Sequence, residues 1–171
     1  QLCVSVFRQI SQEITTIVEK RFDKFKIDHN PQIETAVEFR IEGKMYEDDK
    51  VLRCYNELYA DGGLNFSYDD ETSYLEFYKR HNDAYNLNLD QGHDELKKIC
   101  ICAVSASDAL LMAYYNGHLS HSTLEDVVDD QIRNTYRLMK IPENRIEEIV
   151  KNSKKIEKII DIQYLPYFEF E

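Results

Sequence analysis

The second half of the chain has three long stretches with helical periodicity, and these constrain its fold most. Residues 93–115 are apolar nearly all round and include small side chains that allow close packing, which predicts a central, buried helix. Two further helices are predicted at about 123–139 and 143–160, and Pro142 stands where a helix start tolerates it. We therefore expect a helical C-terminal half of about three helices.

The first half mixes helical and extended patterns. Apolar residues recur every three or four positions from Ser5 to Phe25, which predicts an amphipathic helix, and DHNP at 28–31 ends it. The sequence ETAVEFRIEG at 34–43 alternates apolar and polar residues, which predicts a half-buried strand ending at Gly43. A short helix is expected to follow, beginning at Asp48 or Asp49.

Two later segments complete the predicted sheet. Residues 64–68 and 74–78 alternate around a turn-prone stretch and are predicted to form a hairpin. The tail 162–171 contains Pro166 and fits an edge strand or an extended docking tail. The expected architecture is therefore one α+β domain over residues 1–171, with a small antiparallel sheet packed against the helical C-terminal half.

The overall charge and the cysteines limit the possible partners and compartments. The formal net charge is −11, which argues against direct nucleic-acid binding and against an anionic membrane surface. The run 99–115 is short and contains Asp108, so it is not expected to span a membrane. The spacing of the four cysteines matches no redox or zinc motif, so we expect free, mostly buried thiols and a cytoplasmic protein.

The acidity is concentrated in one segment. Residues 42–95 contain fourteen acidic and five basic residues, so this segment carries −9 of the total charge of −11, and it holds seven of the twelve tyrosines. Carboxylates interleaved with tyrosines suit the binding of a basic, Arg-rich protein surface. The competing interpretation is a solvated face with some tyrosines in the core. The predicted partner-binding residues are Tyr46, Glu47, Asp48, Asp49, Asp61, Tyr68, Asp69, Asp70, Glu71, Tyr74, Glu76 and Tyr78.

A possible metal site lies between the predicted helices of the second half. His118 and His121 are three residues apart, and with Asp126 they could bind a divalent transition metal. The same stretch also has the pattern of a capping box, with Ser122 as the N-cap and Glu125 three residues later. In that interpretation the segment is simply the boundary of a helix.

Common catalytic motifs are absent from the sequence, including phosphate-binding glycine loops, HExxH and the nucleophile elbow. We therefore expect a non-catalytic protein without a cofactor. It would be an inhibitor, immunity or adaptor protein that docks its acidic, tyrosine-bearing residues 46–85 on a basic partner such as a nucleic-acid enzyme. One alternative is a metal-dependent hydrolase using His118 and His121. Another is an oligomerising domain of a longer protein, suggested by the start at Gln1 and the possible docking tail.

Overall fold

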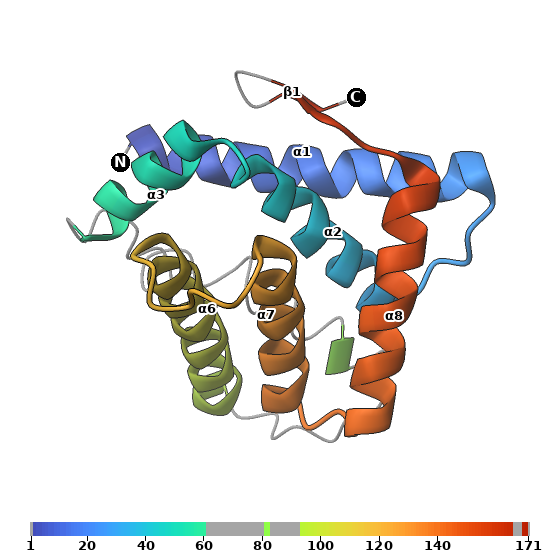
Figure 1. Ribbon diagram of the computed structural model, residues 1–171. Helices are drawn as coiled ribbons and strands as arrows, with labels where there is room; N and C mark the ends of the chain where they lie inside the picture. The colour runs from blue at the N-terminus through green and yellow to red at the C-terminus, as the bar shows by residue number, and fades with distance from the viewer. Residues whose placement is uncertain (1, 61–80, 83–92, 166–168, 171) are drawn as a thin grey trace.

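The described residues of the computed structural model are almost entirely helical (Figure 1). They comprise residues 2–60, 81–82, 93–165 and 169–170. The principal helices are α1 (Leu2–Phe25), α2 (Pro31–Met45), α3 (Asp49–Ala60), α6 (His93–Tyr115), α7 (Leu124–Leu138) and α8 (Glu143–Ile160). The predicted α+β architecture is therefore wrong. Among these residues, extended pairing is limited to β1 (Tyr164–Leu165) and β2 (Glu169–Phe170), which lie antiparallel with Tyr164 opposite Phe170.

The clearest correction concerns residues 34–43, which were predicted to be a strand and lie inside helix α2. Asn30 is the N-cap of this helix, and its side chain accepts hydrogen bonds from the backbone N–H groups of Gln32 and Ile33 at 3.1 and 3.2 Å. Pro31 follows at the first helical position, where its missing N–H has no cost. The sequence DHNP therefore starts the second helix as well as ending the first.

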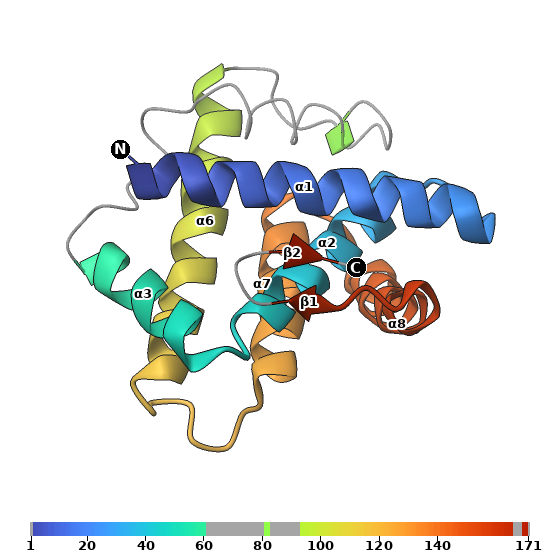
Figure 2. The same ribbon diagram turned by 90° about the horizontal axis from the view of Figure 1, so that it is seen from above.

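Helix α2 is central, because it packs against α1, α7 and α8 (Figures 1 and 2). Its buried residues point in all directions and include polar side chains such as Glu34, Thr35 and Arg40. A helix enclosed in this way has no single apolar face, so the periodicity that identifies surface helices is missing. That explains why its sequence could be taken for a strand.

The other helices close around α2. Helix α1 crosses one end of the molecule, and α6, α7 and α8 stand side by side beneath it in Figure 1. Helices α6 and α7 pack together, as do α7 and α8, while α3 contacts α6. The helices predicted at 5–25, 123–139 and 143–160, and the short helix beginning at Asp48 or Asp49, are confirmed. Fully buried members of the core include Val18, Phe22, Ile41, Ile132, Tyr136, Ile146 and Ile149.

Helix α6 is less buried than its composition suggested. Ile99, Cys100, Ala103 and Leu111 are buried on one side, whereas Cys102 and other residues of the opposite side are exposed. The helix has the predicted extent, but the prediction that it is central and buried is wrong. Its small side chains gave an apolar pattern on a side that is exposed in the described part of the structure.

The tail begins by packing on the domain itself. Ile162 is fully buried, and its backbone carbonyl accepts a hydrogen bond from Lys44 Nζ at 2.8 Å. The same ammonium group forms an ion pair with Glu157 at 2.9 Å. These contacts fix the start of the tail where α8 ends. The predicted hairpin at 64–78 lies outside the described residues.

The described cysteines are free, as the sequence predicted. Cys100 is buried, and burial raises the pKa of its thiol to about 12. Cys54 and Cys102 are exposed, so the expectation that the thiols are mostly buried is wrong for these two residues.

Candidate functional site

Three consecutive carboxylates lie in the turn between α2 and α3, and we call Glu47, Asp48 and Asp49 the acidic corner. Glu47 and Asp49 are exposed, and Asp48 is half-buried. Asp48 Oδ1 accepts a hydrogen bond from the backbone N–H of Lys50 at 2.9 Å, which helps to start α3. In the described part of the chain no basic side chain forms an ion pair with any of the three. Their charge is therefore available to a partner.

The remaining predicted partner-binding residues have different outcomes. Tyr46 is 5% exposed, and its hydroxyl donates to Glu42 Oε1 at 3.0 Å. This burial corrects the prediction that Tyr46 contacts a partner, because its ring turns into the core where α2 ends. The residues outside the described ranges are Asp61, Tyr68, Asp69, Asp70, Glu71, Tyr74, Glu76 and Tyr78.

Two carboxyls and two phenols meet near the end of α2, and we call them the carboxyl–phenol cluster: Glu42, Tyr46, Tyr55 and Asp108. Glu42 is half-buried, and the other three are buried. The Tyr55 hydroxyl of α3 donates to Asp108 Oδ1 of α6 at 2.5 Å. The rings of Tyr46 and Tyr55 meet edge to face, with centroids 5.2 Å apart. No basic side chain of the described residues forms an ion pair with either carboxyl group. The cluster thus joins the end of α2 to α3 and α6, and the described residues supply no compensating positive charge.

Burial changes the acidity of this cluster. Desolvation raises the pKa of Asp108 to about 6, and the hydrogen bond from Tyr55 opposes that rise. Desolvation also raises the pKa of Glu42, against the hydrogen bond from Tyr46, and the negative charge of Asp108 adds to the rise. The pKa of Tyr46 lies well above its ordinary value for the same main reason. Near neutral pH, Asp108 can therefore take up or release a proton.

Sequence reasoning did not find this cluster. Its only signal was Asp108, an acidic residue inside an apolar helix, and such a residue needs a buried polar partner. The partner, Tyr55, lies 53 residues earlier, so sequence periodicity could not connect the two.

The two histidines of the possible metal site lie in the connection between α6 and α7, and both are exposed. The nearby carboxylate of Asp126 accepts hydrogen bonds from the Thr123 backbone N–H at 2.8 Å and from the Thr123 hydroxyl at 2.7 Å. These bonds lower the pKa of Asp126. Within the described ranges, no group of three His, Cys, Asp or Glu side chains is placed to hold a metal ion. The metal-dependent hydrolase has no support from these residues.

A capping box does start α7, but one residue later than predicted. Thr123 is the N-cap, its side chain accepts from the Asp126 backbone N–H at 3.1 Å, and Asp126 completes the box in return. Ser122 and Glu125 therefore do not have the predicted capping roles.

A histidine that the sequence did not single out joins α1 to α2. His29 Nδ1 lies 2.5 Å from Glu34 Oε1, and Nε2 lies 3.0 Å from Asp23 Oδ1. The hydrogen bond with Asp23 raises the pKa of His29 most, followed by that with Glu34. The imidazolium form thus holds a carboxylate on each side of the α1–α2 turn.

Replacing His29 with glutamine is expected to lower the melting temperature more at pH 5.5 than at pH 8.5. The folded-state pKa of His29 is raised, so its contribution to stability is full below the unfolded value of about 6.5 and is lost as pH rises through the folded value. Thermal unfolding of both proteins at the two pH values measures the difference. An equal loss at both values would show that the charge of His29 does not contribute.

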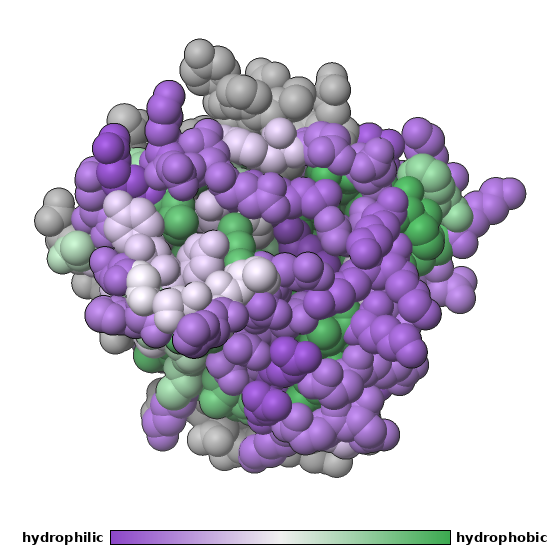
Figure 3. Space-filling view, viewed as in Figure 1, coloured by the Kyte–Doolittle hydropathy of each residue, from purple (hydrophilic) through white to green (hydrophobic). Residues whose placement is uncertain are grey.

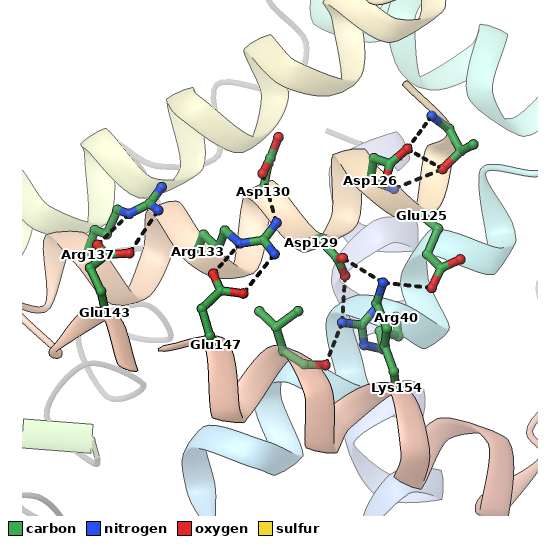
Figure 4. A network of polar contacts seen from close by, with 12 residues as sticks. Arg40, Glu125, Asp126, Asp129, Asp130, Arg133, Arg137, Glu143, Glu147 and Lys154 are labelled. Carbon is green, nitrogen blue, oxygen red and sulfur yellow. Dashed lines mark hydrogen bonds and ion pairs between the residues drawn. The ribbon is translucent and has the colours of Figure 1, made fainter. Parts of the chain in front are cut away.

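A network of polar contacts ties α2, α7 and α8 together (Figure 4). At its centre, Arg40 donates to Asp129 Oδ1 at 2.7 Å, and the two side chains are 3% and 7% exposed. Arg40 also donates to the Ser153 hydroxyl at 2.8 Å and to the Val150 carbonyl at 3.1 Å. Lys154 Nζ lies 2.7 Å from Asp129 Oδ2, so Asp129 forms a second ion pair. Its buried donors and acceptors are engaged with one another, so the centre of this network is structural.

The α7–α8 seam continues outward as a row of arginine–carboxylate pairs (Figure 4). Arg133 contacts Glu147 at 2.7 Å, and Arg137 contacts Glu143 at 2.8 Å. These exposed carboxylates differ from those of the acidic corner because an arginine already neutralises each of them.

Comparison with known proteins leaves the site to be interpreted from its own chemistry. No family model matches the chain, and no curated protein or solved structure matches it significantly. The charges and contacts described above are therefore the basis for a functional proposal.

The surfaces around the site differ in character. The face shown in Figure 3 is mostly hydrophilic, with its hydrophobic residues in small separate patches. In α6, the stretch Lys97–Tyr115 is long and apolar enough to cross a membrane, with a mean hydropathy of 1.3 over 19 residues. Core helices of soluble proteins share these properties, so length and composition alone do not place this helix in a membrane.

Proposed function

We propose that this protein is a non-catalytic binding protein, of the inhibitor, immunity or adaptor kind, that docks on a basic surface of another protein. The observation that carries this proposal is the acidic corner, whose carboxylates are accessible and have no ion-pair partner in the described part of the chain. It belongs to the segment 42–95, which holds −9 of the total charge of −11.

The contrast with the carboxylates of the α7–α8 seam supports this choice. Glu143, Glu147 and Glu148 are also exposed, but each is paired with an arginine of α7 or α8. Free carboxylates attract a positively charged partner over a longer distance and accept its hydrogen bonds on contact, whereas paired ones offer little net field. The acidic corner is thus the better docking surface.

A nucleic-acid enzyme is a suitable partner, because its basic site normally binds phosphates. Carboxylates of an inhibitor can occupy the same arginines and lysines. Such an inhibitor would act in the cytoplasm alongside its target. The alternative of an oligomerising domain from a longer protein stays a prediction, which the size of the protein in solution would test.

Neutralising the corner is expected to weaken binding to an immobilised oligo-arginine peptide. The variant carries Glu47→Gln and Asp49→Asn, and we expect a loss of about tenfold in affinity at low salt, because two charge contacts are removed. Raising the salt from 50 to 300 mM should lower the peptide affinity of the unmodified protein by a similar factor, because salt screens exposed charges. Surface plasmon resonance measures both effects.

The matched control carries Glu143→Gln and Glu147→Gln, which change the net charge by the same two units. These carboxylates are already paired with arginines, so peptide affinity should remain close to that of the unmodified protein. Equal weakening by both double variants would mean that only net charge matters, and affinity insensitive to salt would rule out electrostatic docking.

A further inference from the structure

Helix α3 follows the acidic corner and lies at the edge of the described helices (Figures 1 and 2). It contacts α6 and contributes Val51, Leu52 and Tyr55 to the core. Tyr55 of this helix donates a hydrogen bond to Asp108 of α6, at 2.5 Å. The position of the acidic corner therefore depends in part on a bond to a carboxyl group that can titrate.

We propose that the carboxyl–phenol cluster is a pH-sensitive clasp that holds α3, and with it the acidic corner, against α6. The proposal concerns regulation of the binding surface and rests on the proposed function only for its effect on a partner. The clasp itself follows from the contacts within the chain.

The groups that face Asp108 explain why it should respond to pH. Helix α3 supplies the Tyr55 hydroxyl, while the end of α2 supplies Glu42 and the adjoining Tyr46. On α6 itself, the carbonyl of Ser107, the residue before Asp108, accepts a hydrogen bond from the neutral Gln131 of α7 at 3.1 Å. A buried carboxylate is costly without a positive partner, and a second carboxylate nearby increases that cost.

The direction of the effect follows from the pKa of Asp108, which is raised to about 6 from an ordinary value near 4. A raised folded-state pKa means that the contribution to stability is full below the ordinary value and is lost as pH rises through 6. The clasp should therefore be tightest when Asp108 is protonated, with Tyr55 still able to donate to the carboxyl oxygen. Above pH 6, Asp108 carries a buried negative charge, which desolvation disfavours, and α3 should detach more often.

Hydrogen exchange resolved along the chain, and corrected for the intrinsic effect of pH, can test this clasp in the intact protein. Between pH 5 and pH 7.5, we expect protection of the α3 amides to fall roughly tenfold, as linkage predicts for one carboxyl with this pKa change. Protection of the α7 amides should change much less. An equal change of α3 and α7 protection in the unmodified protein would contradict the clasp.

Two variants and a control make the assignment specific. Asp108→Asn should keep α3 protected at both pH values, because the amide accepts from Tyr55 without carrying charge. Tyr55→Phe should lower α3 protection at pH 5, because it removes the hydrogen bond but keeps the ring. His29→Gln should leave the pH response of α3 unchanged. A normal pH response in Asp108→Asn would overturn the clasp, whereas peptide binding at one fixed pH tests the proposed function separately.

Discussion

Replacing Arg40 with methionine is expected to lower the free energy of unfolding by about 3–5 kcal/mol, the usual cost of removing one partner from a buried ion pair. Arg40 and Asp129 are almost fully buried and 2.7 Å apart. Without the guanidinium, Asp129 keeps Lys154, which is 2.7 Å away but partly exposed. The Ser153 hydroxyl and the Val150 carbonyl also lose a donor. Urea unfolding followed by circular dichroism measures the loss.

Arg133→Met provides the matched control on the same helical seam. Arg133 likewise bonds carboxylates, here Glu147 and Asp130, but both of these are about half exposed. Solvent screens such pairs, so the expected cost is about 0–1 kcal/mol. If the two substitutions cost the same, burial of the Arg40 pair would have no special effect.

A double variant separates the effect of the two charges from the effect of side-chain packing at this site. Arg40→Met combined with Asp129→Leu removes both charges, and apolar replacements of buried ion pairs are often close to neutral. The double variant should therefore be more stable than Arg40→Met alone. A loss equal to the sum of the two single losses would show that the two side chains act independently.

The success of sequence reasoning depended on how far each helix is enclosed. Helices α1, α7 and α8 have one buried and one exposed side, so apolar residues such as Ile14 and Val18, or Ile146 and Ile149, recur at helical spacing. Helix α2 is surrounded, and its polar Arg40 is as buried as its apolar neighbours. Because the alternation of apolar and polar residues did not correspond to inside and outside, it falsely predicted a strand.

The candidate site was predictable only in part, for a related reason. The acidity of the segment 42–95 is a property of composition, so it could be recognised without knowing the fold. Composition does not predict whether a given side chain faces solvent, and Tyr46 in fact points inward, where it bonds Glu42. Contacts such as Tyr55 with Asp108 join residues far apart in the chain, and one sequence has no signal for such pairings.

Gly43 was predicted to end a strand, but it lies within α2. Its role there can be tested by substitution. A Cβ atom at this position would lie 2.7 Å from Cγ2 of Val128 on α7. No real Cβ is accommodated at that distance, and Val128 is β-branched and therefore stiff in a helix. The absence of a side chain is what allows α2 and α7 to approach so closely.

Gly43→Ala is therefore expected to destabilise the protein by about 1–2 kcal/mol. Overpacking costs about 1–3 kcal/mol, and the better helix propensity of alanine returns at most about 1 kcal/mol. Adding Val128→Ala should restore part of the stability, because it removes the methyl group that the new Cβ meets. Chemical denaturation of the single and double variants measures this coupling.

Gly117 is a useful comparison, because glycine is favoured there for a different reason. Its φ is +73°, and a Cβ would meet nothing within 4 Å. Asparagine tolerates that backbone conformation, so Gly117→Asn should have little effect, whereas Gly43→Asn should be more damaging than Gly43→Ala because its side chain is larger. If Gly43→Ala proved neutral or stabilising, or if Val128→Ala gave no rescue, the close approach of α2 and α7 would not limit the residue at this position.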